Sequence, residues 1–124
     1  PAFSVIPIPG PSSVTAALSI AGFPAHQFIF LGFPPHKKGR NKFFSEITGE
    51  KRTAVLLESS HRIQKTIREL SAVLLSNQRV CVMRELTKKF ETVYRGTLPQ
   101  ILAMDIAKKG EFVIVIEGSG RALS

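Results

Sequence analysis

The segment at residues 52–59, RTAVLLES, limits the possible folds more than any other part of the chain. Its apolar residues follow one another almost without interruption, and a β-strand with this pattern is typically covered on both faces. Residues 111–118, EFVIVIEG, are also predicted to form a strand. Strands of this kind need helices on two sides of a sheet, which favours a layered α/β fold.

Helix and strand signals alternate along the rest of the sequence. Helical spacing, cap residues and glycine stops predict helices at residues 12–22, 41–49, 60–74 and 98–110. Apolar or alternating runs predict strands at residues 3–8, 26–33, 52–59, 79–85, 91–97 and 111–118. A short link joins the fourth and fifth strands, so we expect them to pair antiparallel. The prediction is an α/β fold with a mixed, mostly buried sheet of five or six strands and helices on both faces.

Particular residues predict where the helices begin and end. Ser12 or Ser13 is expected to cap the first helix, and Ser59 or Ser60 to cap the third. The fourth helix is expected to run to Gly110, with a proline in its first turn and lysines in its last.

The 124 residues are enough for one domain with a core, because 44% of them are hydrophobic. No apolar run approaches the ~20 residues that span a membrane, and no secretory signal is visible. We therefore expect a cytoplasmic protein without a membrane partner. The sequence begins at Pro1 without an initiator Met. We interpret it as a piece of a longer protein, with a domain at 1–118 and a tail at 119–124.

The cysteine and histidine residues predict no metal site. Cys81, the single cysteine, lies in the run VCVM and is expected to be a buried hydrophobic side chain in a reducing compartment. His26, His36 and His61 are far apart, and no HxxxH or CxxC spacing occurs. GxSxG, GxGxxG and P-loop patterns are also missing. The chain is therefore either part of a larger enzyme or a binding module.

The net charge points to an anionic partner. Seventeen Lys and Arg residues outnumber nine Asp and Glu residues, which gives a formal charge of +8. Such an excess favours nucleic acid or phosphate-bearing ligands, although a basic, inert surface is the alternative. One cluster lies in the loop HKKGRNK, which is either a solvated loop or a phosphate contact made by Lys37, Lys38, Arg40 and Lys42.

Two strand-to-helix junctions are further candidates for ligand contacts. At PGPSS, free backbone N–H groups and the helix dipole can bind an anion, or the turn is merely structural. At LESSHRIQ, polar residues follow an apolar strand at the edge where α/β sheets bind ligands. Their alternative role is to cap the next helix. The candidate residues at the two junctions are Gly10, Pro11, Ser12, Ser13, Glu58, Ser59, Ser60, His61 and Arg62.

The polar segment ELTKKFE separates two strand candidates. Arg84 and Glu85 lie where the fourth strand ends, and Lys88 and Lys89 follow them. The lysines either solvate this link or contact phosphates. A carboxylate such as Glu58 or Glu85 could accept a proton in catalysis, or it could form a structural ion pair with a neighbouring arginine.

Several segments, taken in order, resemble the tetrapyrrole methylase superfamily. They are VIPIPGPSSVTAAL, the GFPP and KKG elements of residues 32–39, VLLESSHRI, VMRELTKKFETVYRGTL and KGEFVIVIEG. Within the superfamily they are most similar to the ribosomal RNA small subunit methyltransferase I family, and the resemblance covers nearly all of residues 3–118. The sequence has Ser60 where that family usually has proline, and the family's N-terminal domain is missing.

The resemblance implies a function. It implies the C-terminal domain of an enzyme that methylates a cytidine 2′-hydroxyl of small-subunit ribosomal RNA with S-adenosylmethionine. The enzyme is expected to be a homodimer, and this fragment is expected to be inactive by itself. The resemblance also implies cofactor contacts at Gly10, Pro11, Ser12 and Ser13, with most of the contacts in the missing domain. RNA contacts are expected from Lys37, Lys38, Arg40, Lys42, His61, Arg62, Arg84, Lys88 and Lys89.

Two other functions remain open from the sequence. A tetrapyrrole methylase would use the same fold, but its site should be an aromatic-lined cleft, and this chain offers a basic loop and no Trp. An RNA-binding module without catalysis is the third hypothesis. The sequence upstream of the chain would distinguish an enzyme from a module.

Overall fold

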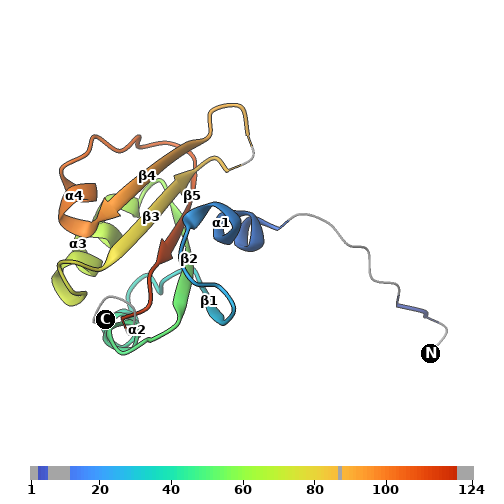
Figure 1. Ribbon diagram of the computed structural model, residues 1–124, viewed down its shortest axis with the longest axis horizontal. Coiled ribbons are helices and arrows are strands. Elements are labelled where there is room, and N and C mark those ends of the chain that lie inside the picture. The colour runs from blue at the N-terminus through green and yellow to red at the C-terminus, as the bar shows by residue number, and fades with distance from the viewer. Residues whose placement is uncertain (1–2, 6–11, 87, 120–124) are drawn as a thin grey trace.

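The computed structural model describes residues 3–5, 12–86 and 88–119 (Figure 1). The strands are β1 (Phe28–Gly32), β2 (Thr53–Ser59), β3 (Arg79–Arg84), β4 (Thr92–Thr97) and β5 (Glu111–Ile116). The helices are α1 (Ser13–Ala21), α2 (Arg40–Thr48), α3 (Ile63–Val73) and α4 (Leu98–Leu102). Strands and helices alternate as the apolar periodicity predicts, except that β4 follows β3 directly.

The five strands form one sheet in the order β1-β2-β5-β3-β4. β1 and β2 run parallel, and the other neighbouring pairs run antiparallel. The sheet is therefore mixed, and the predicted antiparallel pairing of β3 with β4 is confirmed. β5 occupies the centre, where Val115 lies opposite Val55 on one side and Cys81 on the other.

Helices cover both faces of the sheet, as the apolar strands predict (Figure 1). Along β5, Phe112 and Ile114 belong to the core cluster that includes residues of α2, α3 and α4. Val113 and Val115 alternate with them and pack with α1 on the opposite face. The buried Cys81 lies in this second cluster, and burial raises the pKa of its thiol.

The ends of α1 are as predicted. The Ser12 side chain accepts hydrogen bonds from the backbone N–H groups of Val14 and Thr15, so Ser12 is the N-cap. Gly22 ends the helix with a left-handed backbone, φ 82°, which glycine adopts without strain.

The predicted helix at 98–110 is wrong in length, because α4 ends at Leu102. Its start is well determined: Thr97 and Gln100 form a reciprocal capping box. Beyond Leu102, tertiary contacts replace helical ones. The Ala107 N–H donates to the Tyr94 hydroxyl at 3.2 Å, and Ile106 is buried in the core. Packing against the sheet therefore outweighs the helix propensity of this segment.

Two other predictions need correction. α3 begins at Ile63 with Arg62 as its N-cap residue, so neither Ser59 nor Ser60 caps it. Residues 3–5 form no strand, and Phe3 and Val5 are each 92% exposed. The rest of the predicted first strand, residues 6–8, lies outside the described residues.

Candidate functional site

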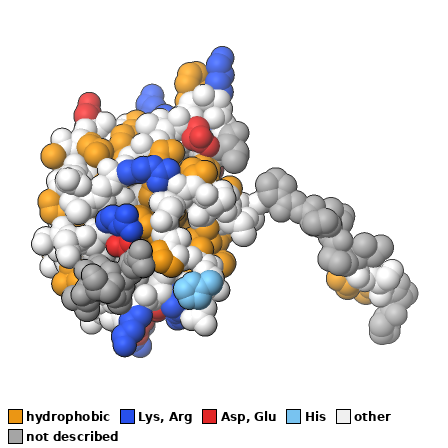
Figure 2. Space-filling view, viewed as in Figure 1, with side chains coloured by type: hydrophobic (Ala, Val, Ile, Leu, Met, Phe, Trp, Pro, Cys, Tyr) orange, Lys and Arg blue, Asp and Glu red, His pale blue; other side chains and the backbone are white. Residues whose placement is uncertain are grey.

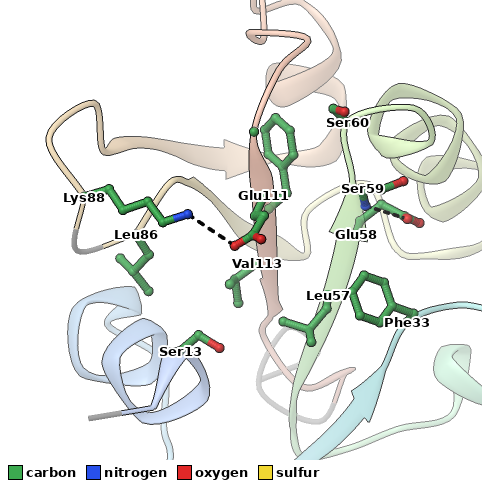
Figure 3. A pocket seen from close by; sticks show the side chains of 12 residues that line it. Ser13, Phe33, Leu57, Glu58, Ser59, Ser60, Leu86, Lys88, Glu111 and Val113 are labelled. Carbon is green, nitrogen blue, oxygen red and sulfur yellow. Dashed lines mark hydrogen bonds and ion pairs between the residues drawn. The ribbon is translucent and has the colours of Figure 1, made fainter.

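A pocket of about 440 Å³ opens at the end of the sheet where β1, β2 and β3 finish and β5 begins (Figure 3). Phe33 and Leu57 lie on one side of it, and Leu86 and Lys88 lie on the other. This is the edge at which α/β sheets bind ligands. The lining residues are Ser13, Phe33, Leu57, Glu58, Ser59, Ser60, Leu86, Lys88, Gly110, Glu111, Phe112 and Val113.

Glu58 lines the pocket but is only 2% exposed, and most of its hydrogen-bonding capacity is used inside the protein. Its Oε2 accepts from the Thr66 hydroxyl at 2.6 Å, and its Oε1 accepts from the Ser59 N–H at 2.8 Å. Arg62 Nε lies 3.4 Å from the same Oε1. These contacts fix the Glu58 carboxylate in one orientation. They include an ion pair with Arg62, which is the structural alternative to a catalytic role that the sequence left open.

Arg40 is a structural residue of the same network. It is 6% exposed, and its guanidinium donates to Thr66 Oγ1, to the Pro35 carbonyl and to both carboxylate oxygens of Glu69. It also lies 5.0 Å from the centre of the Phe44 ring. The sequence places this arginine in an exposed basic loop, and its partner Glu69 is distant in sequence. Arg40 therefore joins the basic loop to α3. Its guanidinium hydrogen-bonds to protein groups and is not exposed as the predicted RNA contact would require.

Lys88 bridges two carboxylates at the rim of the pocket. Its ammonium lies 2.9 Å from Glu85 Oε2. It also lies 3.4 Å from Glu111 Oε2, a contact that Figure 3 draws. The contact with Lys88 lowers the pKa of the Glu85 carboxyl, and the contact with Glu85 raises the pKa of Lys88. Glu85 and Lys88 thus form an ion pair beside the pocket.

The serine turn before α1 contributes one residue to the pocket. Ser13, the first residue of α1, lines it, while the Ser12 hydroxyl is occupied as the helix cap. Gly10 and Pro11 lie outside the described residues. The predicted anion contact at this turn therefore stays a prediction.

The other predicted RNA contacts lie outside the pocket lining. Arg84 donates to the carbonyls of Lys109 and Phe90, so it ties the β3–β4 connection to the segment before β5. The remaining charged candidates are exposed, and Figure 2 shows lysine and arginine side chains spread over one face between hydrophobic ones. These exposed candidates are Lys37, Lys38, Lys42, His61 and Lys89.

Sequence reasoning missed the apolar part of the pocket. Phe33, Leu57 and Leu86 line it, yet each belongs to a strand or strand end that reads as ordinary core. Ser59, by contrast, was a candidate from the sequence, and its buried Oγ has no hydrogen-bond partner within the described part of the chain. Only the spatial meeting of β1, β2 and β3 reveals these residues as neighbours.

No three His, Cys, Asp or Glu side chains among the described residues gather where they could hold a metal ion. None of the helices in this part of the chain has the length and apolarity needed to cross a membrane.

Comparisons with curated proteins find ribosomal RNA small subunit methyltransferase I from several bacteria. The chain is 42% identical to the Xylella fastidiosa (strain 9a5c) protein over 120 residues, which is 93% of this chain and 44% of the relative. It is 39% identical to the Escherichia coli O157:H7 protein, covering 92% of this chain and 42% of the relative. The Thermotoga maritima protein is 34% identical, and half of its length is covered. The chain thus spans at most about half of these relatives.

Solved structures show the same fold at lower identity. Cobalt precorrin-4 methyltransferase, a cobalamin biosynthetic enzyme, superposes with a TM-score of 0.64 at 22% identity, covering 94% of this chain and 52% of that one. Diphthine synthase gives a TM-score of 0.62 at 15% identity, covering 87% and 46%. The family model of the Tetrapyrrole (Corrin/Porphyrin) Methylases matches residues 1–102. The chain therefore belongs to the tetrapyrrole (corrin/porphyrin) methylase family.

Proposed function

We propose that this chain is the C-terminal domain of an S-adenosylmethionine-dependent methyltransferase that modifies a cytidine 2′-hydroxyl of small-subunit ribosomal RNA. The pocket at the end of the sheet carries the proposal, because it combines an apolar lining with charged side chains, among them Lys88 and Glu58. The charge of +8 suits a polyanionic substrate such as RNA. The names of the curated relatives support the same substrate.

The pocket fits part of a nucleoside-containing cofactor. Its volume of about 440 Å³ lies within the usual range for small-molecule sites, and its walls include Phe33 and Leu57. The unpartnered Ser59 Oγ adds a polar group to these walls. When bound, S-adenosylmethionine would supply the methyl group. In this proposal Ser12, Ser13 and the preceding Gly10 and Pro11 form one wall of its site, and a second domain supplies the rest.

The protein's own contribution to the reaction is positioning and proton removal. The ribose oxygen must approach the methyl group in line with the bond that breaks. Holding the nucleotide in that position therefore provides much of the rate enhancement. The hydroxyl proton must leave as the new oxygen–carbon bond forms. Glu58 and Glu85 are the candidate acceptors, although Glu58 is already held by Thr66 and Arg62. Because it is anchored in this way, Glu58 is better suited to orienting neighbouring side chains such as Arg62 than to accepting the proton.

The RNA backbone would lie across the exposed cations around the pocket. Lys37, Lys38, Lys42 and Lys89 present charged ends to solvent, and Lys88 stands at the rim. His61, Arg62 and Arg84 are the further candidates, whereas the buried Arg40 is left out of this surface. A homodimer in the cytoplasm completes the proposal.

The test is methyl transfer from labelled S-adenosylmethionine to purified small ribosomal subunits. The full-length protein should label the small-subunit RNA at a cytidine ribose. Residues 1–124 alone should fold and transfer no methyl group, since they provide one wall of the site. Lack of labelling by the full-length protein, or robust transfer by residues 1–124, would contradict the proposal.

A further inference from the structure

The connection between β3 and β4 ends in an ordered turn. The Glu91 N–H donates to the Lys88 carbonyl at 3.1 Å, which places Lys89 and Phe90 at the two central positions. Arg84 donates to the Phe90 carbonyl at 3.2 Å, and the Lys88 N–H donates to the Glu85 carbonyl at 2.9 Å. The tip is therefore held in one shape by backbone contacts, although it projects beyond the sheet (Figure 1).

This turn presents an aromatic ring to solvent. Phe90 is 68% exposed, and Lys89 Nζ lies 5.6 Å from the centre of its ring. Figure 2 shows hydrophobic and cationic side chains together at the top of the molecule, where Figure 1 places this connection. The ring contributes little to the core at this exposure, so its face is accessible to a binding partner.

The turn adjoins the pocket. The same connection supplies Leu86 and Lys88 to the pocket lining, only a few residues before Phe90. A second exposed ring, that of Phe33, lines the opposite side and is 57% exposed (Figure 3). One aromatic ring therefore lines the pocket, and a second, beside a lysine, lies two residues beyond the lining residue Lys88.

We propose that Phe90, with Lys89, stacks on an unpaired base of single-stranded RNA beside the nucleotide in the pocket, and that Phe33 provides a second stacking surface. This inference rests on the proposed function. Single-stranded nucleic acid is bound by stacking its bases on aromatic side chains while cations hold the backbone. A paired helix hides its base faces, so this surface selects an unpaired segment of the RNA.

Charge complementarity favours RNA over a protein partner at this surface. A second copy of the chain would bring its own positive charge of +8 to a turn whose tip carries Lys89, whereas Lys88 is paired with Glu85 and Glu111. The core of a protein–protein interface is typically depleted of lysine. A polyanion with exposed base faces provides a partner for both the Phe90 ring and the Lys89 ammonium.

The test compares Phe90→Ala, Phe90→Tyr and Phe28→Ala in the full-length protein, with fluorescence anisotropy on a labelled single-stranded RNA and on a duplex of the same sequence. Phe28 is a matched control, because it is exposed but begins β1 at the opposite end of the sheet from the pocket. Phe90→Ala should weaken binding of the single strand roughly 5- to 150-fold. Phe90→Tyr and Phe28→Ala should bind like the wild type, and the duplex should bind weakly to every variant.

A salt titration separates stacking from charge. Stacking releases no counterions, so Phe90→Ala should lower the affinity without changing the slope of log affinity against log salt. Unchanged single-strand affinity in Phe90→Ala, an equal loss for the duplex, or a change in oligomeric state by sedimentation would overturn the inference. Absence of RNA binding by the wild type would overturn it as well. Methyl transfer by the wild type, measured separately, tests the proposed function itself.

Discussion

Glu85 and Gly110 fit against each other beside the pocket. Glu85 has a left-handed backbone, φ 52°, at the end of β3, where its N–H donates to the Glu111 carbonyl at 2.9 Å. Gly110 has φ 107°, and a β-carbon placed on it would lie 2.6 Å from Glu85 Oε1. The backbone conformation therefore favours glycine at this position, and a larger residue would also displace the Glu85 side chain.

Gly110→Ala should destabilise the fold by about 1–3 kcal/mol, because it combines backbone strain with a steric conflict. Urea unfolding of the variant and the wild type measures the difference. Gly49→Ala is the control: its φ is −90°, and its nearest neighbouring atom would lie at 3.9 Å. Equal destabilisation by the two substitutions would contradict the local explanation.

The Glu85–Lys88 ion pair should make stability depend on pH. Lys88 lowers the pKa of Glu85 below its usual 4.5, so the folded state favours the ionised carboxyl. This contribution is complete at neutral pH and is lost as the pH falls through the lowered pKa. Glu85→Gln should therefore remove stability at neutral pH and little in acid.

Thermal unfolding at a series of pH values checks this expectation, with Lys88→Met as the matched variant. In the Lys88→Met background the neutral-pH effect of Glu85→Gln should shrink, because the partner that lowers the pKa is gone. Parallel pH profiles for the wild type and Glu85→Gln would show that the pair does not contribute.

At the scale of elements, buried polar contacts join β2, α2 and α3. Thr66 of α3 is fully buried; it donates to Glu58 at the end of β2 and accepts from Arg40 at the start of α2, at 2.6 and 3.0 Å. The arginine continues to Glu69. One hydroxyl therefore links three elements behind the wall of the pocket.

Thr66→Val should destabilise the protein by about 1–3 kcal/mol, since a buried carboxylate loses its donor and a buried guanidinium loses an acceptor. Thr66→Ser keeps the hydroxyl and should lose less. Chemical denaturation of the two variants gives the comparison. A Val variant as stable as the wild type would mean that the network adds nothing to folding.

The sequence predicts most elements well because their signals are local. Ser12 and Gly22 mark the ends of α1, and the apolar runs mark β2 and β5. The segment after Leu102 escapes prediction because its partner, the Tyr94 hydroxyl, comes from another element. The burial of Arg40 likewise depends on Glu69, which is distant in the chain. The edge that holds the pocket was predictable from strand ends, whereas its apolar lining required the strand order.

At the scale of the whole molecule, electrostatics should govern affinity for RNA. Each phosphate neutralised on a single strand contributes a slope of about −0.7 in log affinity against log salt. Lys88→Ala combined with Lys89→Ala should make the slope of the full-length protein shallower by up to roughly 1.4. Lys88 will contribute the smaller part, because Glu85 and Glu111 already neutralise it.

Titration of RNA binding against salt measures this slope, and unfolding experiments provide the control. Both lysines are exposed, so their removal should change the free energy of unfolding by less than about 1 kcal/mol. A slope equal to that of the wild type would mean that the lysines only solvate the connection between β3 and β4.

The central place of β5 affects how the polypeptide folds as it is made. β5 is the last strand along the described chain, yet it separates β2 from β3 and pairs with both. While the ribosome is still making the segment before Glu111, β2 and β3 each have one sheet edge without its partner strand. Long-range pairing of this kind forms late and slowly. The nascent chain therefore stays unfinished, with its apolar strands exposed to chaperones, until Ile116 has left the exit tunnel.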